Sequence, residues 1–245
     1  MNELTFAAFC AALFVVSVLF GCVGQGGGSG YIAAMVLFGF AAETIKPTAL
    51  VLNVFVSSVV AWRFYRAGHL SWRLLMPFAI ASVPTALVGG YLTLPTTIFN
   101  RLLGVLLLIA AVPFLVRREF APAPVTAPRL PVAIIAGAIM GLLSGLTGVG
   151  GGILILPLFL YCSWATPRVA AALAGVFVLI NSAAALVGHL GAIRSLPPGL
   201  SAYVLVAVLG GFVGAQLGSL HLPASAIYRV LGLLLLVSSI KLLLA

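Results

Sequence analysis

Two short runs of glycine interrupt an otherwise apolar sequence, and both have the composition of a backbone anion site. Residues 24–30 read Gly-Gln-Gly-Gly-Gly-Ser-Gly, and residues 148–152 read Gly-Val-Gly-Gly-Gly. Glycine has no Cβ, so the backbone can turn sharply there and direct its N–H groups toward one point. The first N–H groups of a helix that starts after such a run have no partner and carry partial positive charge. Such a helix start can bind an anion without the cost of burying Lys or Arg in a membrane.

A few polar side chains lie in or near these runs and could add donors to an anion site. Gln25 and Ser29 lie inside the first run, and Thr147 borders the second. Asn53 and Ser57 are four residues apart, which places them on one face of a helix. The predicted substrate contacts are Gln25, Gly26, Gly27, Gly28, Ser29, Asn53, Ser57, Thr147, Gly150, Gly151, Gly152 and Asn181. Close packing and hydrogen bonding between helices would explain the same residue types, so that interpretation stays open.

The composition places these residues in a membrane protein. Hydrophobic residues make up 63% of the 245-residue chain and charged residues 6%, whereas soluble domains carry about 25% charged residues. The apolar runs are roughly 17–23 residues long, as helices that cross a bilayer require. A β-barrel would show shorter segments of alternating hydrophobicity. We therefore predict an all-α polytopic membrane protein that crosses its membrane several times and contacts the lipid bilayer.

Charge and cysteine usage exclude several classes of function. The formal net charge is +9, but the basic residues stand singly or in pairs near segment ends, as topology signals do, so no nucleic-acid partner is expected. The three acidic residues also lie near segment ends, which argues against a cation pump built on buried carboxylates. The three cysteines lack metal-ligand spacing, and no GxxxxGK[ST] motif occurs. We expect no metal, no cofactor and no hydrolysis of ATP.

Two similar sets of five segments must position the candidate residues. They are predicted at 5–21, 31–42, 47–64, 72–93 and 98–116, and again at 131–147, 153–163, from 167 onward, 198–220 and 225–244. The two glycine runs start 124 residues apart, about half the chain length, and Leu94-Pro95 to Gly104 recurs as Leu222-Pro223 to Gly232. We interpret the pattern as an internal duplication, with a first membrane repeat at 1–120, a Pro-rich linker at 121–130 and a second membrane repeat at 131–245.

The segments that follow the glycine runs are too short to cross a bilayer upright. We predict about eight transmembrane helices plus two broken or re-entrant half-helices, ten segments in total. If all ten segments cross, each half has five spans and the repeats are inverted; the sequence leaves this open. Lys46 and Arg168 are interpreted as residues at a membrane boundary. Two basic clusters are predicted to be cytoplasmic: Arg63, Arg66 and Arg73, and Arg117, Arg118 and Arg129.

The order of these features resembles the TauE/SafE sulfite-exporter family. In each half a glycine run precedes a short helix and then a proline-preceded helix rich in small and polar residues. The stretches that carry the resemblance are 24–37 with 46–50, and 141–157 with 170–182. The resemblance implies a transporter of small sulfur-containing anions such as sulfite, sulfonates, sulfoacetate or thiosulfate, located in the inner membrane of a bacterium. The first run departs from the second because it ends in Ser29-Gly30 where the second has Ile153-Leu154.

We therefore predict a secondary transporter for a small anionic substrate, in which two halves alternate access around a mid-membrane site. Coupling to a proton or ion and assembly into a homo-oligomer are left open. A passive anion channel is the alternative. A rhomboid-like serine protease is a third interpretation, because Gly27-Gly28-Ser29-Gly30 matches its GxSG pattern. The second run has Ile153 in place of that serine, so we do not expect an enzyme.

Overall fold

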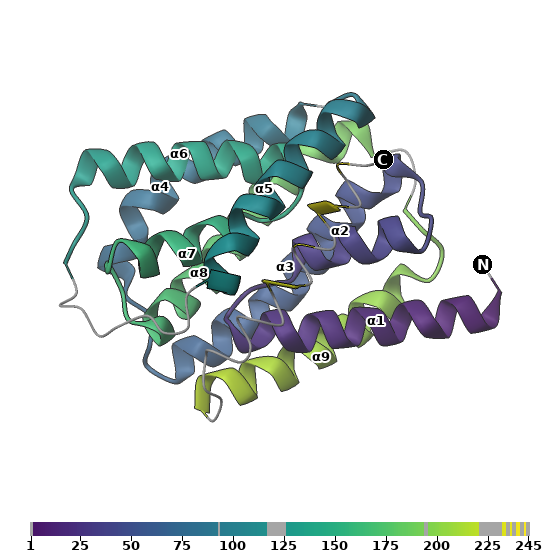
Figure 1. Ribbon diagram of the computed structural model, residues 1–245, viewed down its shortest axis with the longest axis horizontal. Coiled ribbons are helices and arrows are strands. Elements are labelled where there is room, and N and C mark those ends of the chain that lie inside the picture. The colour runs from purple at the N-terminus through teal and green to yellow at the C-terminus, as the bar shows by residue number, and fades with distance from the viewer. Residues whose placement is uncertain are drawn as a thin grey trace.

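The protein is a bundle of apolar helices (Figure 1). The structure is a computed structural model that describes residues 2–92, 94–116, 126–193 and 196–220, with 232–233, 236, 239–240 and 243 beyond them. Most of the predicted segment 225–244 and half of the linker 121–130 therefore lie outside the described residues, as do Arg117 and Arg118. The described helices are α1 (Glu3–Cys22), α2 (Gly28–Leu37), α3 (Ala42–Arg66), α4 (Trp72–Tyr91), α5 (Thr96–Val116), α6 (Leu130–Thr147), α7 (Gly152–Tyr161), α8 (Pro167–His189), the 3-10 turn η1 (Leu190–Ala192) and α9 (Leu200–Leu220).

The described helices confirm the class of an all-α polytopic membrane protein. Six of them are long and apolar enough to cross a bilayer, namely α1, α3, α4, α6, α8 and α9. Helices α2 and α7 are apolar and have ten residues each, so a short helix follows each glycine run as expected. The total of about eight spans and the internal duplication stay predictions.

Two predicted segments have wrong boundaries. The segment predicted at 31–42 is α2 at Gly28–Leu37, because the last glycines of the first run already belong to the helix. The third segment also differs. The sequence suggests that the third segment starts at Pro47, because proline suits the first turn of a helix. In the structure α3 starts at Ala42 and Pro47 lies inside it. A proline at this position removes one backbone hydrogen bond, which helices buried among other helices tolerate. Since α3 starts five residues earlier, Lys46 belongs to the helix and not to a loop before it.

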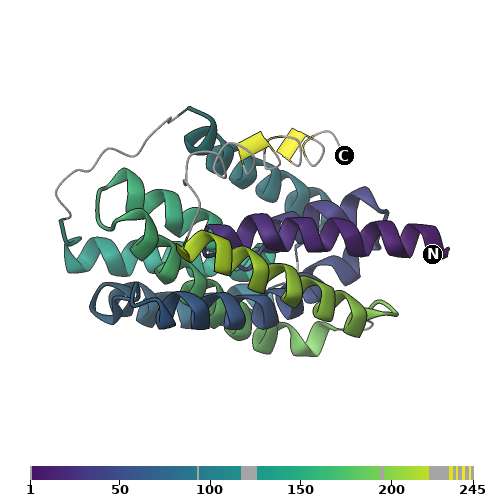
Figure 2. The same ribbon diagram turned by 90° about the horizontal axis from the view of Figure 1, so that it is seen from below.

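Helices α1 and α9 pack side by side and run in the same direction (Figures 1 and 2). Three glycines of α9, spaced four residues apart, each face a backbone carbonyl of α1: Gly210 faces Phe14, Gly214 faces Val18 and Gly218 faces Cys22. Since residue numbers rise together on both helices, the pair is parallel. Glycine at every fourth position lets the two backbones approach closely.

Helices α4 and α6 form a second pair of the same kind on the other side of the bundle (Figure 1). Here the glycines belong to α6: Gly137 faces the carbonyl of Phe78, Gly141 that of Ser82 and Gly145 that of Ala86. This pair is also parallel. Each of the two closest pairs thus combines one helix from the first half of the chain with one from the second half.

Helices α3 and α8 occupy the centre of the bundle. In the most apolar 18-residue stretch of each helix, 67% of α3 and 72% of α8 is buried, whereas the share is 33–39% in the other candidate spans. They run antiparallel, because Gly175 of α8 faces Ala61 near the end of α3, while His189 at the end of α8 and Lys46 near the start of α3 bond the same carbonyl, that of Gly90. The outer helices therefore present the surface for lipid, and α3 and α8 position the interior polar residues.

Most of the described arginines gather at one end of the bundle. Arg63 and Arg66 end α3, and Arg73 starts α4. Arg129 precedes α6, which runs parallel to α4, and Arg168 starts α8, which runs antiparallel to α3. All five lie at the same end, which we call the arginine end. The starts of α1 and α3, with Glu3 and Glu43, lie at the opposite end.

Candidate functional site

Each glycine run forms an unwound break between a long helix and a short one. The residue before each short helix, Gly27 for α2 and Gly151 for α7, has a left-handed backbone with φ of +100° and +77°. Only glycine adopts this conformation at little cost, which explains the residue type at both positions. Residues 20–35 and 147–153 are all buried, so both breaks lie inside the bundle.

The two short helices run from the interior toward opposite ends of the protein. Phe38, at the end of α2, packs against Phe9 near the start of α1, with ring centres 5.2 Å apart. Phe159 of α7 packs against Phe78 near the arginine end, with ring centres 5.1 Å apart. The N-terminal ends of α2 and α7, which carry free N–H groups and partial positive charge, therefore both lie in the middle of the bundle.

The two breaks meet at Asn53, in the middle of α3. Nδ2 of Asn53 donates a hydrogen bond to the carbonyl oxygen of Gly148, at 3.3 Å. A Cβ on Gly26 would lie 3.0 Å from Oδ1 of Asn53, and one on Gly150 would lie 3.0 Å from its Nδ2. Asn53 therefore contacts both breaks, and we call this region the crossing.

The breaks also touch each other directly, and side chains close around them. A Cβ on Gly28 would lie 2.5 Å from the carbonyl oxygen of Val149, and one on Gly152 would lie 3.4 Å from Cγ of Gln25. On the side of α8, Oγ of Ser182 lies 2.8 Å from the Cβ position of Gly150. The structure thus brings together six of the predicted residues: Gln25, Gly26, Gly28, Asn53, Gly150 and Gly152.

The other predicted residues lie close by but make local contacts. The Ser57 hydroxyl donates to the carbonyl of Asn53, the Thr147 hydroxyl to that of Leu143 at 2.6 Å, and Nδ2 of Asn181 to that of Phe177 at 2.8 Å. These donors are used within their own helices. Gly27 and Gly151 face the rings of Tyr31 and Phe177, so they shape the turns.

Several polar atoms near the breaks are buried without a hydrogen-bond partner among the described residues. They are Oγ of Ser29, Ser144 and Ser182, Oγ1 of Thr48, and Oδ1 of Asn53 and Asn181. Each of these side chains is at most 1% exposed. Such an atom costs about 1–3 kcal/mol when nothing satisfies it, and a concentration of them calls for a ligand or water. Ser144 and Thr48 are not among the predicted contacts. Ser144 lies one helical turn before Thr147, and this spacing could have indicated it.

Ser29 lies at the start of α2, and its hydroxyl oxygen has no hydrogen-bond partner among the described residues. A nucleophilic serine needs a neighbouring base. The two described histidines lie elsewhere, since His189 bonds the carbonyl of Gly90 and His69 lies between α3 and α4 near Arg168. The part of the chain that the structure describes contains no group of three His, Cys, Asp or Glu residues that could hold a metal ion.

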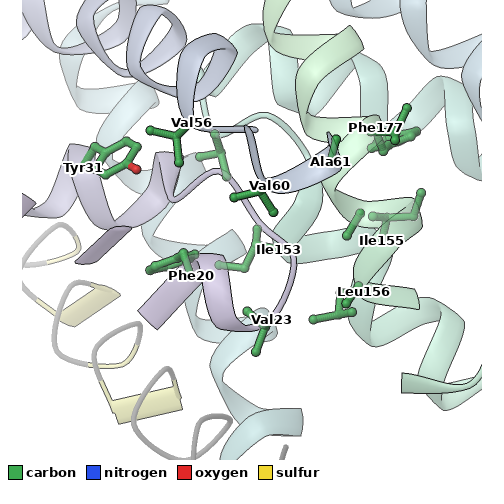
Figure 3. Close-up of a cluster of buried hydrophobic side chains, with 14 of the residues drawn as sticks. Phe20, Val23, Tyr31, Val56, Val60, Ala61, Ile153, Ile155, Leu156 and Phe177 are labelled. Atoms are coloured by element: carbon green, nitrogen blue, oxygen red, sulfur yellow. The ribbon is translucent and has the colours of Figure 1, made fainter. Parts of the chain in front are cut away.

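Apolar side chains enclose the breaks. One buried cluster combines Phe20, Val23 and Val60 with Ile153 and Phe177 of the second half (Figure 3). A cavity of about 800 Å³ lies away from the crossing, at the end opposite the arginines, and is lined by Phe6, Phe38, Phe40 and Tyr203 among others. Because apolar walls lower the local dielectric, polar groups at the crossing would act more strongly on a charged ligand than in water.

The chain is similar to a known family of membrane proteins. The family model described as sulfite exporter TauE/SafE matches residues 9–242. The probable membrane transporter protein y4hK of Sinorhizobium fredii is 40% identical over 95% of this chain and 96% of its own. The probable membrane transporter proteins YjnA of Bacillus subtilis, 27% identical over 93% of this chain and 95% of its own, and MJ0441 of Methanocaldococcus jannaschii, 26% identical over 73% and 72%, are also similar. No solved structure matches significantly.

Proposed function

Because the chain belongs to the TauE/SafE sulfite exporter family and is a multi-pass membrane transporter, we propose that it is a secondary transporter that binds a small oxidised-sulfur anion at the crossing. The observation that carries this proposal is the meeting of two helix N-termini at Asn53, among buried polar atoms without partners. The transporter class follows from the family. The sulfur anion is suggested by the description of the family, and the place and mode of binding are our inference from the geometry.

The chemistry of the crossing suits an oxyanion. Backbone N–H groups at the starts of α2 and α7 can donate to negatively charged oxygens, and the hydroxyls of Ser29 and Ser182 are free to do the same. These donors are neutral, so the empty site avoids the cost of a buried charge. Sulfite, sulfonates, sulfoacetate and thiosulfate all present several oxygens on one small group, so several neutral donors could bind one anion at the same time.

Movement by alternating access is the second part of the proposal. Broken helices that meet at mid-membrane and repeats of opposite orientation are features of such carriers. If the chain is a duplication, the antiparallel course of α3 and α8 fits an inverted repeat. The pairs α1/α9 and α4/α6 each join the two halves through backbone contacts. We therefore expect these two pairs to move as the rigid units around α3 and α8, and not the two halves of the sequence.

The arginine end is proposed to face the cytoplasm of a bacterial cell, since basic residues accumulate on the cytoplasmic side of membrane proteins. The opposite end, where α1 and α3 start, would then face outward.

The decisive experiment is flux into proteoliposomes with sulfite, methanesulfonate, sulfoacetate, thiosulfate, sulfate and acetate as separate substrates. The proposal expects saturable uptake of at least one sulfur anion, and faster uptake when the same anion is present inside. Saturable uptake with such counterflow indicates a carrier. Uptake that never saturates and shows no counterflow would favour the passive anion channel. If no sulfur anion is taken up or bound, the substrate class is wrong.

A further inference from the structure

Lys46 is buried inside the bundle, although the sequence suggested a residue at the membrane boundary. Its side chain is 8% exposed. The ammonium donates to three backbone carbonyls at the end of α4, those of Gly89 and Gly90 at 3.3 Å each and that of Leu92 at 3.1 Å. The last carbonyls of a helix lack partners within the helix and carry partial negative charge, so this end of α4 holds the cation in place.

No carboxylate compensates this charge in the part of the chain that the structure describes. Glu3 and Glu43 are exposed at the starts of α1 and α3, and neither forms a described hydrogen bond or ion pair with Lys46. Carbonyl dipoles stabilise a buried ammonium only in part. A charged residue at such a place in a membrane protein is costly and marks a functional site.

His189, the last residue of α8, shares one acceptor with Lys46. Its Nδ1 lies 3.0 Å from the carbonyl oxygen of Gly90, and the residue is 6% exposed. Lys46 comes from α3 and His189 from α8, which are the two central helices that also supply Asn53 and Ser182 to the crossing. Each of the two helices therefore carries one buried polar side chain at the crossing and another at this pair.

The second break connects the two places. A Cβ on Gly148 would lie 3.1 Å from Cγ of Lys46, and the carbonyl of the same Gly148 accepts the hydrogen bond of Asn53. Lys46 and Asn53 are seven residues apart on α3, which is about two helical turns or roughly 10 Å along the axis. Both side chains are buried, so they point to the same interior face.

We infer that Lys46 and His189 form a second anion subsite, one step from the crossing and at the end opposite the arginines. The inference rests on the proposed function, because it assumes that the transported ligand is an anion. The Lys46 ammonium exchanges a carbonyl of α4 for an oxygen of the anion, and the Nδ1–H group of His189 turns from the carbonyl of Gly90 to the anion as the second donor. Because Lys46 adds a full positive charge to the neutral donors of the crossing, this subsite favours doubly charged anions over singly charged ones of similar size.

The test compares thiosulfate, which is doubly charged at neutral pH, with singly charged methanesulfonate in proteoliposome flux. Lys46→Gln is expected to raise the half-saturating thiosulfate concentration about tenfold or more, which corresponds to about 1.4 kcal/mol. The value for methanesulfonate should change by less than about twofold. Lys46→Arg keeps the charge and should retain the preference for thiosulfate. His189→Gln should raise the half-saturating concentration of thiosulfate more than that of methanesulfonate. As a control, Arg101→Gln removes an exposed charge near the start of α5 and should leave the half-saturating concentrations of both anions unchanged.

If Lys46→Gln weakened the transport of both anions equally, Lys46 would only stabilise the end of α4. If the half-saturating concentration of neither anion changed, no subsite would exist there. If Lys46→Gln does not fold, as judged by thermal unfolding in detergent, His189→Gln and Lys46→Arg carry the test alone; an unaltered preference in His189→Gln then overturns the subsite. The proposed function fails separately, when the unaltered protein transports and binds neither anion.

Discussion

Asn53 of α3 donates a hydrogen bond to the backbone carbonyl of Gly148, which starts the second break, across a separation of 95 residues in sequence. The same side chain touches Gly26 of the first break through its Oδ1. One amide thus fixes the position of both unwound segments. A change at this side chain therefore acts on both breaks at once, and so on the backbone donors proposed to hold the anion at the crossing.

Replacement of Asn53 distinguishes an anion site from a packing contact. Asn53→Asp keeps the size of the side chain but adds a negative charge, so it should abolish anion uptake, because like charges repel strongly in a buried site. Asn53→Ala should lower uptake less, about tenfold, through loss of one hydrogen bond of about 1 kcal/mol and of packing. Uptake rates in proteoliposomes measure both. If Asp and Ala reduced uptake equally, the charge of the ligand would not matter at this position.

Two glycines with the same backbone conformation allow a matched test of the crossing. Gly150 and Gly39 have φ values of +84° and +75°, so alanine strains the backbone about equally at both. A Cβ on Gly150 would meet Ser182, Val178 and Asn53, whereas one on Gly39 would meet nothing within 4 Å. Gly150→Ala should reduce anion uptake about tenfold or more, and Gly39→Ala should leave it within about twofold. Equal effects in the two variants would rule out a specific role for the second break.

The parallel pair α4/α6 depends on glycine for stability and not for ligand contact. A Cβ on Gly141 would overlap the backbone carbonyl of Ser82, while one on Gly191 would meet nothing within 4 Å. Gly141→Ala is therefore expected to destabilise the protein by about 1–3 kcal/mol, and Gly191→Ala by less than about 0.5 kcal/mol. Thermal unfolding in detergent measures the difference. An unchanged melting temperature for Gly141→Ala would contradict the close approach of the two backbones.

The exposed native cysteine Cys162 allows a test of which end of the protein faces the cytoplasm. Cys162 is exposed and follows α7 at the arginine end, which we assign to the cytoplasm. A membrane-impermeant maleimide added to intact cells should leave Cys162 unlabelled until the cells are permeabilised. In a second variant that combines Cys162→Ser with Gly39→Cys, the new thiol lies at the opposite end and should react with the maleimide in intact cells. Labelling of Cys162 from outside would reverse the proposed orientation.

Part of the candidate site could be read from residue types alone. Runs of glycine break helices wherever they occur, so the two short helices and the left-handed residues before them were predictable from local sequence. The choice between Asn53 and Ser57 was not. Both lie on one helix face, but only the packing of the second break against α3 decides that Asn53 contacts it, while the Ser57 hydroxyl bonds back to the carbonyl of Asn53.

Composition and the spacing of apolar runs by themselves determined that this is a helical membrane protein with two glycine breaks, because a lipid environment requires apolar spans whose backbone bonds are internal. Only the tertiary structure decided that the breaks meet at Asn53, that Lys46 is buried against α4, and that α1 pairs with α9 and α4 with α6. These relationships join residues far apart in the chain and depend on how each helix is rotated about its axis. Apolar periodicity does not specify that rotation when nearly every residue of a helix is apolar.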